Sequence, residues 1–320
     1  MTILNIEEKV SFEEKQYDLL TIGEILVDMI SKDFSEDFSN DEYVKKFGGS
    51  PANIVINTKR LGLNSIIASS VGYDGFGDFL VSYLQNQEVD ISLITRTTCP
   101  TSMVVVTRSK GTPIPIFYRG ADYEIEYTQK LEEAIKNSKI MHFSTWPLSR
   151  EKSRKVVEKG IEVAKKSGTL IGFDPNYHKD LWDMDVDGVS YIKSIIKYVD
   201  FIKPSEDDAE RIFGKDTPEN QIKKFIELGA KLVVMTLGKD GVIVADKNQM
   251  QRFSTLATEV QDTTGAGDAF WSGFYTGIVK GRSIQEAVKV GLAASAFKLR
   301  YIGAISPMPK YEDLIKEFNV

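Results

Sequence analysis

The chain has 320 residues, of which 42% are hydrophobic and 27% are charged, with 24 glycines and 10 prolines. This balance is typical of a globular protein with a sizeable core and excludes a disordered chain. Forty Lys and Arg against 46 Asp and Glu give a net charge of −6. No basic block stands out, so we expect no nucleic-acid partner.

Cys99 is the only cysteine, which excludes an internal disulfide and a thiolate zinc site within one chain. Residues 1–16 alternate acids and bases without the long apolar run of a secretory signal, and we interpret them as a frayed extension. No apolar stretch approaches the ~20 residues that cross a bilayer. We therefore expect a cytoplasmic protein that has no membrane partner.

The first predicted element is the apolar run at 17–23, which is typical of a buried parallel strand. Helical spacing at 50–61, with Pro51 in the first turn, precedes a strand-like run at 65–72 and an amphipathic run at 76–87. This alternation is the βαβ rhythm of a parallel sheet with helices on both faces.

The same rhythm returns in the second half of the chain, where apolar runs and helical segments alternate again. We predict one domain over 17–320, a three-layer α/β/α sandwich around a mostly parallel sheet. The predicted strands are 139–145, 169–174, 199–204 and 231–237, and the predicted helices include 150–166 and 221–228.

Two inserts interrupt the rhythm, at 26–47 and 95–127. The second contains SMVVVTRS and PIPIFYR, whose period of two predicts short antiparallel strands in a small extra sheet. A small sheet over one edge of the large one predicts a lid that closes over a substrate. The alternative is a fixed sheet that makes a homodimer contact through the lid.

The segment from Asp262 to Asp268 reads DTTGAGD and precedes a helix-compatible run. Glycines before a helix let N–H groups converge on one point, and the helix N-terminus adds about half a positive charge there. An acid inside such an anion site has a purpose if it takes a proton from an attacking hydroxyl. Alternatively, Asp268 is an ordinary helix cap after a tight turn.

A second segment, GGSPAN, opens the helix at 50–61. Gly48 and Gly49 let the backbone approach a ligand closely, and Asn53 can donate to and accept from a sugar hydroxyl. Paired glycines before Ser and Pro are also a good helix entry.

Taken together, GGSPANIVINTKRLG and DTTGAGDAFWSGF resemble the two signature segments of the ribokinase-like family of carbohydrate kinases. GYDGFGDFL at 72–80 resembles a third family segment, and the resemblance runs from about residue 17 to the C-terminus. It implies a parallel sheet between helices with a small β lid. It also implies ATP-dependent sugar phosphorylation without a Walker P-loop, and the sequence has no G-x-x-x-x-G-K-[ST].

The resemblance implies that Asp268 deprotonates the sugar hydroxyl while backbone amides hold the γ-phosphate. Asp28 matches the acid that relatives use for sugar hydroxyls, although a solvated loop carboxylate is the alternative. The implied phosphate-holding amides belong to Gly265, Ala266 and Gly267, and the implied sugar contacts are Asp28, Gly48, Gly49 and Asn53.

For the nucleotide, Thr236, Gly238 and Gly241 match the turn that relatives place at the phosphates and adenosine, although a β-hairpin would look the same. The family's N-x-x-E segment, which organises Mg²⁺ through water, has become Ser205 to Asp208 here. Both positions depart from the family pattern, which leaves their metal roles open.

Many relatives bind a monovalent cation beside the anion site, and the resemblance implies potassium here. Asp262 and Thr264 match its first ligands, and the loop 302–306, with Gly303 and Ser306, matches the region that supplies the others.

Among family members the chain looks most like bacterial fructokinases, which implies conversion of fructose to fructose 6-phosphate. The alternative is 2-keto-3-deoxygluconate kinase. Arg119 could reach the sugar from the lid. His178 stands where both subfamilies usually have arginine, which favours a neutral sugar over a sugar acid.

Two other functional classes compete with a kinase. A catalytically inactive, sugar-binding regulatory relative would have no need for Asp268 inside an anion site. A dinucleotide-binding oxidoreductase would need G-x-G-x-x-G after the first strand, and the chain has Gly23-Glu24-Ile25 there.

Overall fold

The computed structural model describes residues 4–34, 37–108 and 115–320. Its large sheet has nine strands in the order β13-β12-β11-β10-β9-β8-β1-β4-β5. The strands from β5 to β11 pair in parallel, and β12 and β13 extend one edge as an antiparallel hairpin. They are β1 (Tyr17–Ile22), β4 (Ser65–Gly72), β5 (Asp90–Thr97), β8 (Ser138–Ser144), β9 (Leu170–Asp174), β10 (Phe201–Ile202), β11 (Leu232–Thr236), β12 (Val242–Ala245) and β13 (Met250–Phe253).

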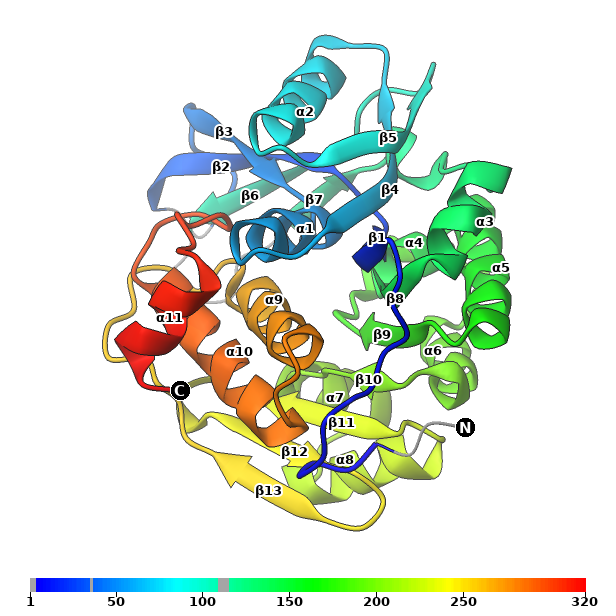
Figure 1. The fold of residues 1–320 in the computed structure, drawn as a ribbon. Coiled ribbons are helices and arrows are strands. Elements are labelled where there is room, and N and C mark those ends of the chain that lie inside the picture. The colour runs from blue at the N-terminus through cyan, green and yellow to red at the C-terminus, as the bar shows by residue number, and fades with distance from the viewer. Residues whose placement is uncertain (1–3, 35–36, 109–114) are drawn as a thin grey trace.

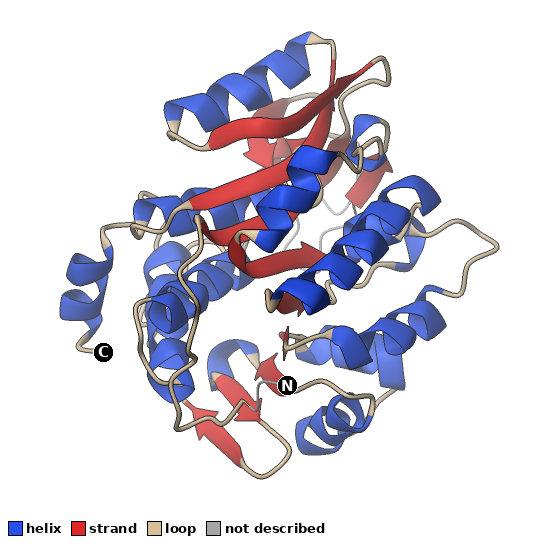
Figure 2. Ribbon diagram, turned by 45° about the vertical axis from the view of Figure 1, so that its right-hand side comes forward, coloured by secondary structure: helices blue, strands red, loops and turns tan. Residues whose placement is uncertain are grey.

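Helices cover both faces of this sheet (Figure 1, Figure 2). They are α1 (Ser50–Arg60), α2 (Gly75–Asn86), α3 (Gln129–Lys136), α4 (Thr145–Leu148), α5 (Glu151–Ser167), α6 (Gly188–Ile195), α7 (Glu206–Phe213), α8 (Pro218–Glu227), α9 (Ala266–Val279), α10 (Ile284–Leu299) and α11 (Tyr311–Phe318). Within the described ranges, no helix is long and apolar enough to cross a membrane.

Alternate side chains of β1 enter different cores because strand side chains alternate between faces. Leu20 and Ile22 pack with residues of α3 and α5 to α8, whereas Leu19 packs with residues of α1, α9 and α10. Burial on both faces explains the near-continuous apolar runs in the sequence. The predicted three-layer sandwich is confirmed.

The lid sheet has four strands in the order β3-β2-β6-β7. They are β2 (Leu26–Phe34), β3 (Tyr43–Gly48), β6 (Met103–Arg108) and β7 (Pro115–Tyr118). The outer pairs are antiparallel, but β2 and β6 run parallel, so the expectation of antiparallel strands is wrong for the central pair. The strands β1 and β5 end at the same edge of the large sheet, and β2 and β6, which follow them, therefore leave it in the same direction. Positions 35–36 and 109–114 of the predicted inserts lie outside the described residues.

The N-terminal segment is packed against the domain rather than frayed, which corrects the expectation for residues 4–16; residues 1–3 lie outside the described part. Leu4, Ile6 and Val10 are buried in the core formed with α9 and α10. The Ile6 N–H donates to the Asp246 carboxylate over 3.2 Å, and the segment then runs along the large sheet to β1 (Figure 1). Three apolar side chains among many charges are enough to anchor it.

Candidate active site

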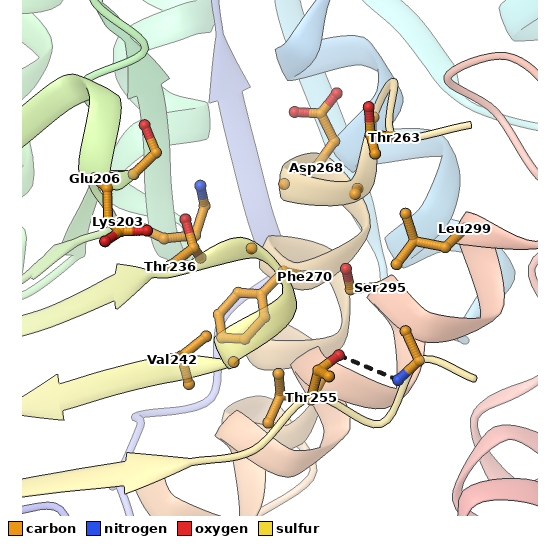
Figure 3. Close-up of a pocket in the computed structure, with 18 of the residues that line it drawn as sticks. Lys203, Glu206, Thr236, Val242, Thr255, Thr263, Asp268, Phe270, Ser295 and Leu299 are labelled. Atoms are coloured by element: carbon orange, nitrogen blue, oxygen red, sulfur yellow. Dashed lines mark hydrogen bonds between the residues drawn. The ribbon is translucent and has the colours of Figure 1, made fainter. Parts of the chain in front are cut away.

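A cleft of about 890 Å³ opens where β9, β10 and β11 end and α9 begins. It is lined by Asp174, Lys203 and Thr236, from or just after these three strands, and by Asp268. Figure 3 shows Lys203, Thr236 and Asp268 around the cleft. Ligands of parallel α/β sheets collect at the carboxyl ends of the strands. The cleft therefore lies where this architecture places a ligand site.

Asp268 lies in the first turn of α9 and faces the N-terminus of α1. Its Oδ1 accepts a hydrogen bond from the Ser50 hydroxyl over 2.6 Å, and its Oδ2 accepts one from the Asn53 amide over 2.9 Å. The two segments that the sequence singled out thus meet at one carboxylate. Ser50, which the sequence analysis did not assign, belongs to this group.

Loss of solvation raises the pKa of Asp268 to about 6, while the hydrogen bonds from Ser50 and Asn53 oppose that rise. The Asp174 carboxylate raises this pKa further and the Lys203 ammonium lowers it. A carboxylate that is ionised at neutral pH, with a pKa close below it, suits a general base.

The turn before α9 presents the anion site. Gly265 has φ of 76°, and a Cβ there would collide with the Ala304 backbone. The Gly265 and Gly267 N–H groups have no partner among the described contacts, which leaves them free for an anion. The Ala266 N–H instead donates to the Thr263 carbonyl over 3.1 Å, so its predicted role as a phosphate donor does not hold in this conformation.

Lys203 adds a cation that the sequence analysis missed. Its Nζ lies 3.3 Å from where a Cβ on Gly267 would be and 3.1 Å from Asp174 Oδ2. The Trp271 indole donates to the same carboxylate oxygen over 2.8 Å. The ammonium is thus almost fully buried and held at the N-terminus of α9, beside the anion site. The sequence gives one indication of this cation, because Lys203 directly follows Phe201 and Ile202 near the end of the predicted strand 199–204.

Asp28, which was predicted to hold sugar hydroxyls, lies in lid strand β2 and not in a loop at the end of β1. Loss of solvation, followed by the nearby Asp268 carboxylate, raises its pKa to about 7. A Cβ on Gly48 would collide with the Asp28 carboxylate, and one on Gly49, at φ of 108°, would collide with the Glu24 carbonyl. These glycines let the lid and α1 approach each other closely.

Glu24 supports this approach and was not assigned from the sequence. Its Oε1 accepts the Ser50 N–H over 3.2 Å, and its Oε2 is buried with no partner among the described residues. Burial raises the pKa of Glu24 to about 8. The side chain is therefore a neutral carboxylic acid at pH 7 that positions the start of α1.

Arg119 is not available to a sugar, contrary to the sequence-based assignment. Its guanidinium donates to the buried Asp122 carboxylate through two nitrogens, and its other donors go to Ser149 Oγ and to the Leu181 and Trp146 carbonyls. All five N–H groups of an arginine are thus engaged. Arg119 holds the base of the lid against α4.

His178 is half-buried and lies against the lid. Its ring meets Phe117 edge to face, with centroids 5.0 Å apart, and burial lowers its pKa. Phe117 occupies the same face of the lid sheet as Asp28, because both pair with Val104. The imidazole is therefore a neutral neighbour of the face of the lid that carries Asp28.

On the nucleotide side, the structure brings the predicted residues into the cleft: Ser205, Thr236, Gly238 and Gly241. The segment from Thr236 to Gly241 is also the connection of the β11–β12 hairpin, through the short 3₁₀ turn Gly238–Asp240. The two interpretations of this segment are therefore compatible.

Asp208 does not fit the metal role considered for it. Its Oδ2 accepts from the Ser205 N–H and hydroxyl in a capping box of α7, and its Oδ1 accepts the Tyr177 N–H. Glu206 and Asp207 are exposed and line the cleft. The described residues include no cluster of three or more metal-ligating side chains, so a magnesium ion would be held mainly by phosphates and water.

Asp262, Thr264 and Gly303, which were predicted for a monovalent cation, do come together, but the oxygens of Asp262 are occupied. Asp262 Oδ1 accepts from the Thr264 N–H and hydroxyl, and Oδ2 accepts the Gly303 N–H over 2.7 Å. The Asp262 carbonyl accepts the Lys298 ammonium over 2.7 Å. Ser306 Oγ is buried with no partner in the described part of the chain. Because protein donors hold both carboxylate oxygens and the carbonyl of Asp262, this residue is not free to face a potassium ion as arranged.

Comparison with known proteins agrees with this geometry. Residues 16–311 match the model of the pfkB family carbohydrate kinases. The chain is 57% identical over 318 residues, 99% of each chain, to the ATP-dependent 6-phosphofructokinase of Thermoanaerobacterium thermosaccharolyticum.

Two solved structures are similar throughout. Halothermothrix orenii fructokinase is 37% identical with a TM-score of 0.79, over 90% of this chain and 99% of that one. A fructokinase double mutant from Vibrio cholerae O395, with fructose, ADP and a potassium ion bound, is 26% identical with a TM-score of 0.82, over 95% and 99%. The chain therefore belongs to the pfkB family of carbohydrate kinases and is an ATP-dependent sugar kinase.

Proposed function

We propose that the enzyme transfers the γ-phosphoryl of ATP to a hydroxyl of a fructose unit, with fructose 6-phosphate as the preferred acceptor. The observation that carries the transfer chemistry is the Asp268 carboxylate, which Ser50 and Asn53 orient beside the free N–H groups of the α9 turn. The 57% identical relative named a 6-phosphofructokinase supports the acceptor.

In this proposal Asp268 accepts the proton of the attacking hydroxyl. The Gly265 and Gly267 N–H groups and the Lys203 ammonium stabilise negative charge on the phosphoryl group as it moves. Val242, Phe270 and Leu292 give the far end of the cleft an apolar lining that suits a nucleobase. ATP supplies the phosphoryl group, and Mg²⁺ bound to its phosphates would lie near Glu206 and Asp207.

Lys46 is the side chain that favours a phosphorylated acceptor. It pairs with Asp28 across β2 and β3, so the two side chains share the sugar-facing side of the lid. Lys46 is exposed and has no ion pair among the described contacts. A sugar with a second phosphate would give this ammonium a partner.

Unphosphorylated fructose is the second candidate, as the sequence analysis expected. The similarity to Halothermothrix orenii fructokinase favours it. The engagement of Arg119 by Asp122 also removes one cation that a phosphate could otherwise have used.

Adjacent lysines allow a matched test of the acceptor. Lys45 lies on the opposite face of the lid, with its ammonium 3.9 Å from the centre of the Phe79 ring. We expect Lys46→Met to lower kcat/KM for fructose 6-phosphate by about tenfold, or ~1.4 kcal/mol, with little effect on fructose. Lys45→Met should change neither value. A wild-type enzyme that prefers fructose, or an equal loss on both sugars in Lys46→Met, would reject the phosphorylated acceptor.

We also propose that the lid forms a homodimer contact and that the enzyme acts in the cytoplasm. The lid carries exposed apolar side chains, including Phe34 at 59% and Tyr118 at 52% exposure. Sedimentation of the wild type and of Tyr118→Lys tests the contact. A monomeric wild type at micromolar concentration would rule it out.

A further inference from the structure

Lys298 is a buried ammonium in the last turn of α10. Its side chain is 0% exposed, and its Nζ donates to the Asp262 carbonyl over 2.7 Å. Among the described residues, no carboxylate forms an ion pair with it. Burying an ammonium without a carboxylate partner is costly, so its position needs a reason beyond packing.

The ammonium lies directly behind the anion site. Asp262 begins the segment that turns at Gly265 into α9, and its N–H and that of Gln261 donate to the Leu299 carbonyl, next to Lys298. The carboxylates of Asp262 and Asp268 both attract the Lys298 charge. A positive charge is thus fixed between the end of α10 and the start of the turn from Asp262 to Gly265, which precedes α9 and is called the phosphate turn below.

The same place is where the resemblance implied a potassium ion. Such an ion needs several oxygen atoms free to face it. Here both carboxylate oxygens of Asp262 accept N–H groups, and its carbonyl oxygen faces the Lys298 ammonium. An ammonium group and K⁺ carry the same charge and have similar sizes, and both interact favourably with a carbonyl oxygen.

We propose that the Lys298 ammonium takes the place of the monovalent cation, so that the enzyme reaches its full rate without potassium. It holds the Asp262 carbonyl, and with it the phosphate turn. It also contributes a fixed positive charge to the site in which negative charge moves during transfer. This inference rests on the proposed phosphoryl transfer and adds a positioning residue to it.

The first measurement uses the unmodified enzyme. kcat is compared in KCl, NaCl and choline chloride at equal ionic strength, with Mg²⁺ and ATP saturating. We expect the three values to agree within about twofold, because the positive charge is already part of the chain. Activation by K⁺ of more than about fivefold over choline would overturn the proposal.

The second measurement removes the Lys298 ammonium by substitution. Lys298→Ala should lower kcat in choline chloride by about tenfold or more, and KCl or NH₄Cl should restore at least about fivefold of that loss. Lys298→Met, whose side chain fills the space without a charge, should lose activity without recovery. Lys289→Ala, at an exposed position on the same helix, should behave as the wild type.

A readout that does not depend on turnover separates this inference from the proposed reaction. KCl should raise the Tm of Lys298→Ala relative to choline chloride, and should leave the Tm of the wild type and of Lys298→Met unchanged. A Lys298→Ala enzyme with neither kinetic nor thermal response to K⁺ would overturn the proposal, even if sugar phosphorylation is confirmed. If Lys298→Ala fails to fold, the wild-type comparison decides alone.

Discussion

Asp268 is held by two donors, Ser50 and Asn53, before any substrate is present. We expect Asp268→Asn to lower kcat by at least ~10²-fold, the usual worth of a general base, because the amide cannot take up the proton. Sugar and ATP binding, measured by calorimetry, should change little. Retention of more than about a tenth of wild-type kcat would contradict the assignment.

We expect Lys203 to tune the pKa of Asp268, the proposed base. Its charge lowers the pKa of Asp268, which lies at about 6, so Lys203→Met should raise that pKa. Because the base must be ionised, kcat/KM of the wild type should rise as pH increases through about 6. In Lys203→Met this rise should move to higher pH. An unmoved rise with an equal loss at every pH would mean that Lys203 does not act through Asp268.

Much of the site could be predicted at the level of single residues, and the two lysines that were missed share one cause. Asp268, Asn53 and the glycines stand in short motifs in which sequence neighbours are also spatial neighbours. Lys203 and Lys298 each reach their partners from other elements, which no local pattern reveals. The Arg119 prediction was wrong because Asp122, three residues away, takes its donors.

Among the elements, the lid is the one expected to move. Its strands β2, β3, β6 and β7 form a sheet separate from the large one, and closure over a sugar would bury them further. Amide exchange in β2 and β6 should slow when sugar is added, while exchange in the buried helix α9 should not change. Equal protection with and without sugar would indicate a fixed sheet.

Elements with one clear period were predictable, and short or mixed ones were not. The helix at 50–61 and the strand at 65–72 correspond to α1 and β4 within a residue. The run at 199–204 yields only the two-residue β10, because a 3₁₀ turn at Ile196–Tyr198 ends just before it and Pro204, just after it, has no N–H for a ladder. The parallel pairing of β2 with β6 depends on the direction in which the two inserts leave the large sheet. The local periodicity of the sequence carries no information about that direction.

The stability of the whole molecule should depend on the protonation of Glu24. Its pKa is about 8 in the folded protein against an ordinary 4.5, so between these values the folded state holds a proton that the unfolded state releases. This contribution is fully present below pH 4.5 and is lost as pH rises through about 8. The slope is about 1.4 kcal/mol per pH unit.

Glu24→Gln removes this proton linkage. The free energy of unfolding of both proteins is measured by urea titration between pH 5.5 and 7.5, a span of about two units. As pH rises over this span, the variant should become more stable relative to the wild type by up to ~3 kcal/mol. Parallel pH dependences for the two proteins would show that the buried carboxyl is not neutral.

The packing of residues 4–16 has a consequence for the order of events during synthesis. The Ile6 N–H donates to Asp246, 240 positions later in the chain. The backbone of Lys9 forms an antiparallel β-bridge with that of Ser283. At ribosomal speeds of about 5–20 residues per second, this segment waits roughly 10–50 s for its binding surface to appear. Residues 4–16 therefore leave the ribosome well before the surface that binds them, and they can reach their final places only after α9 and α10 have been synthesised.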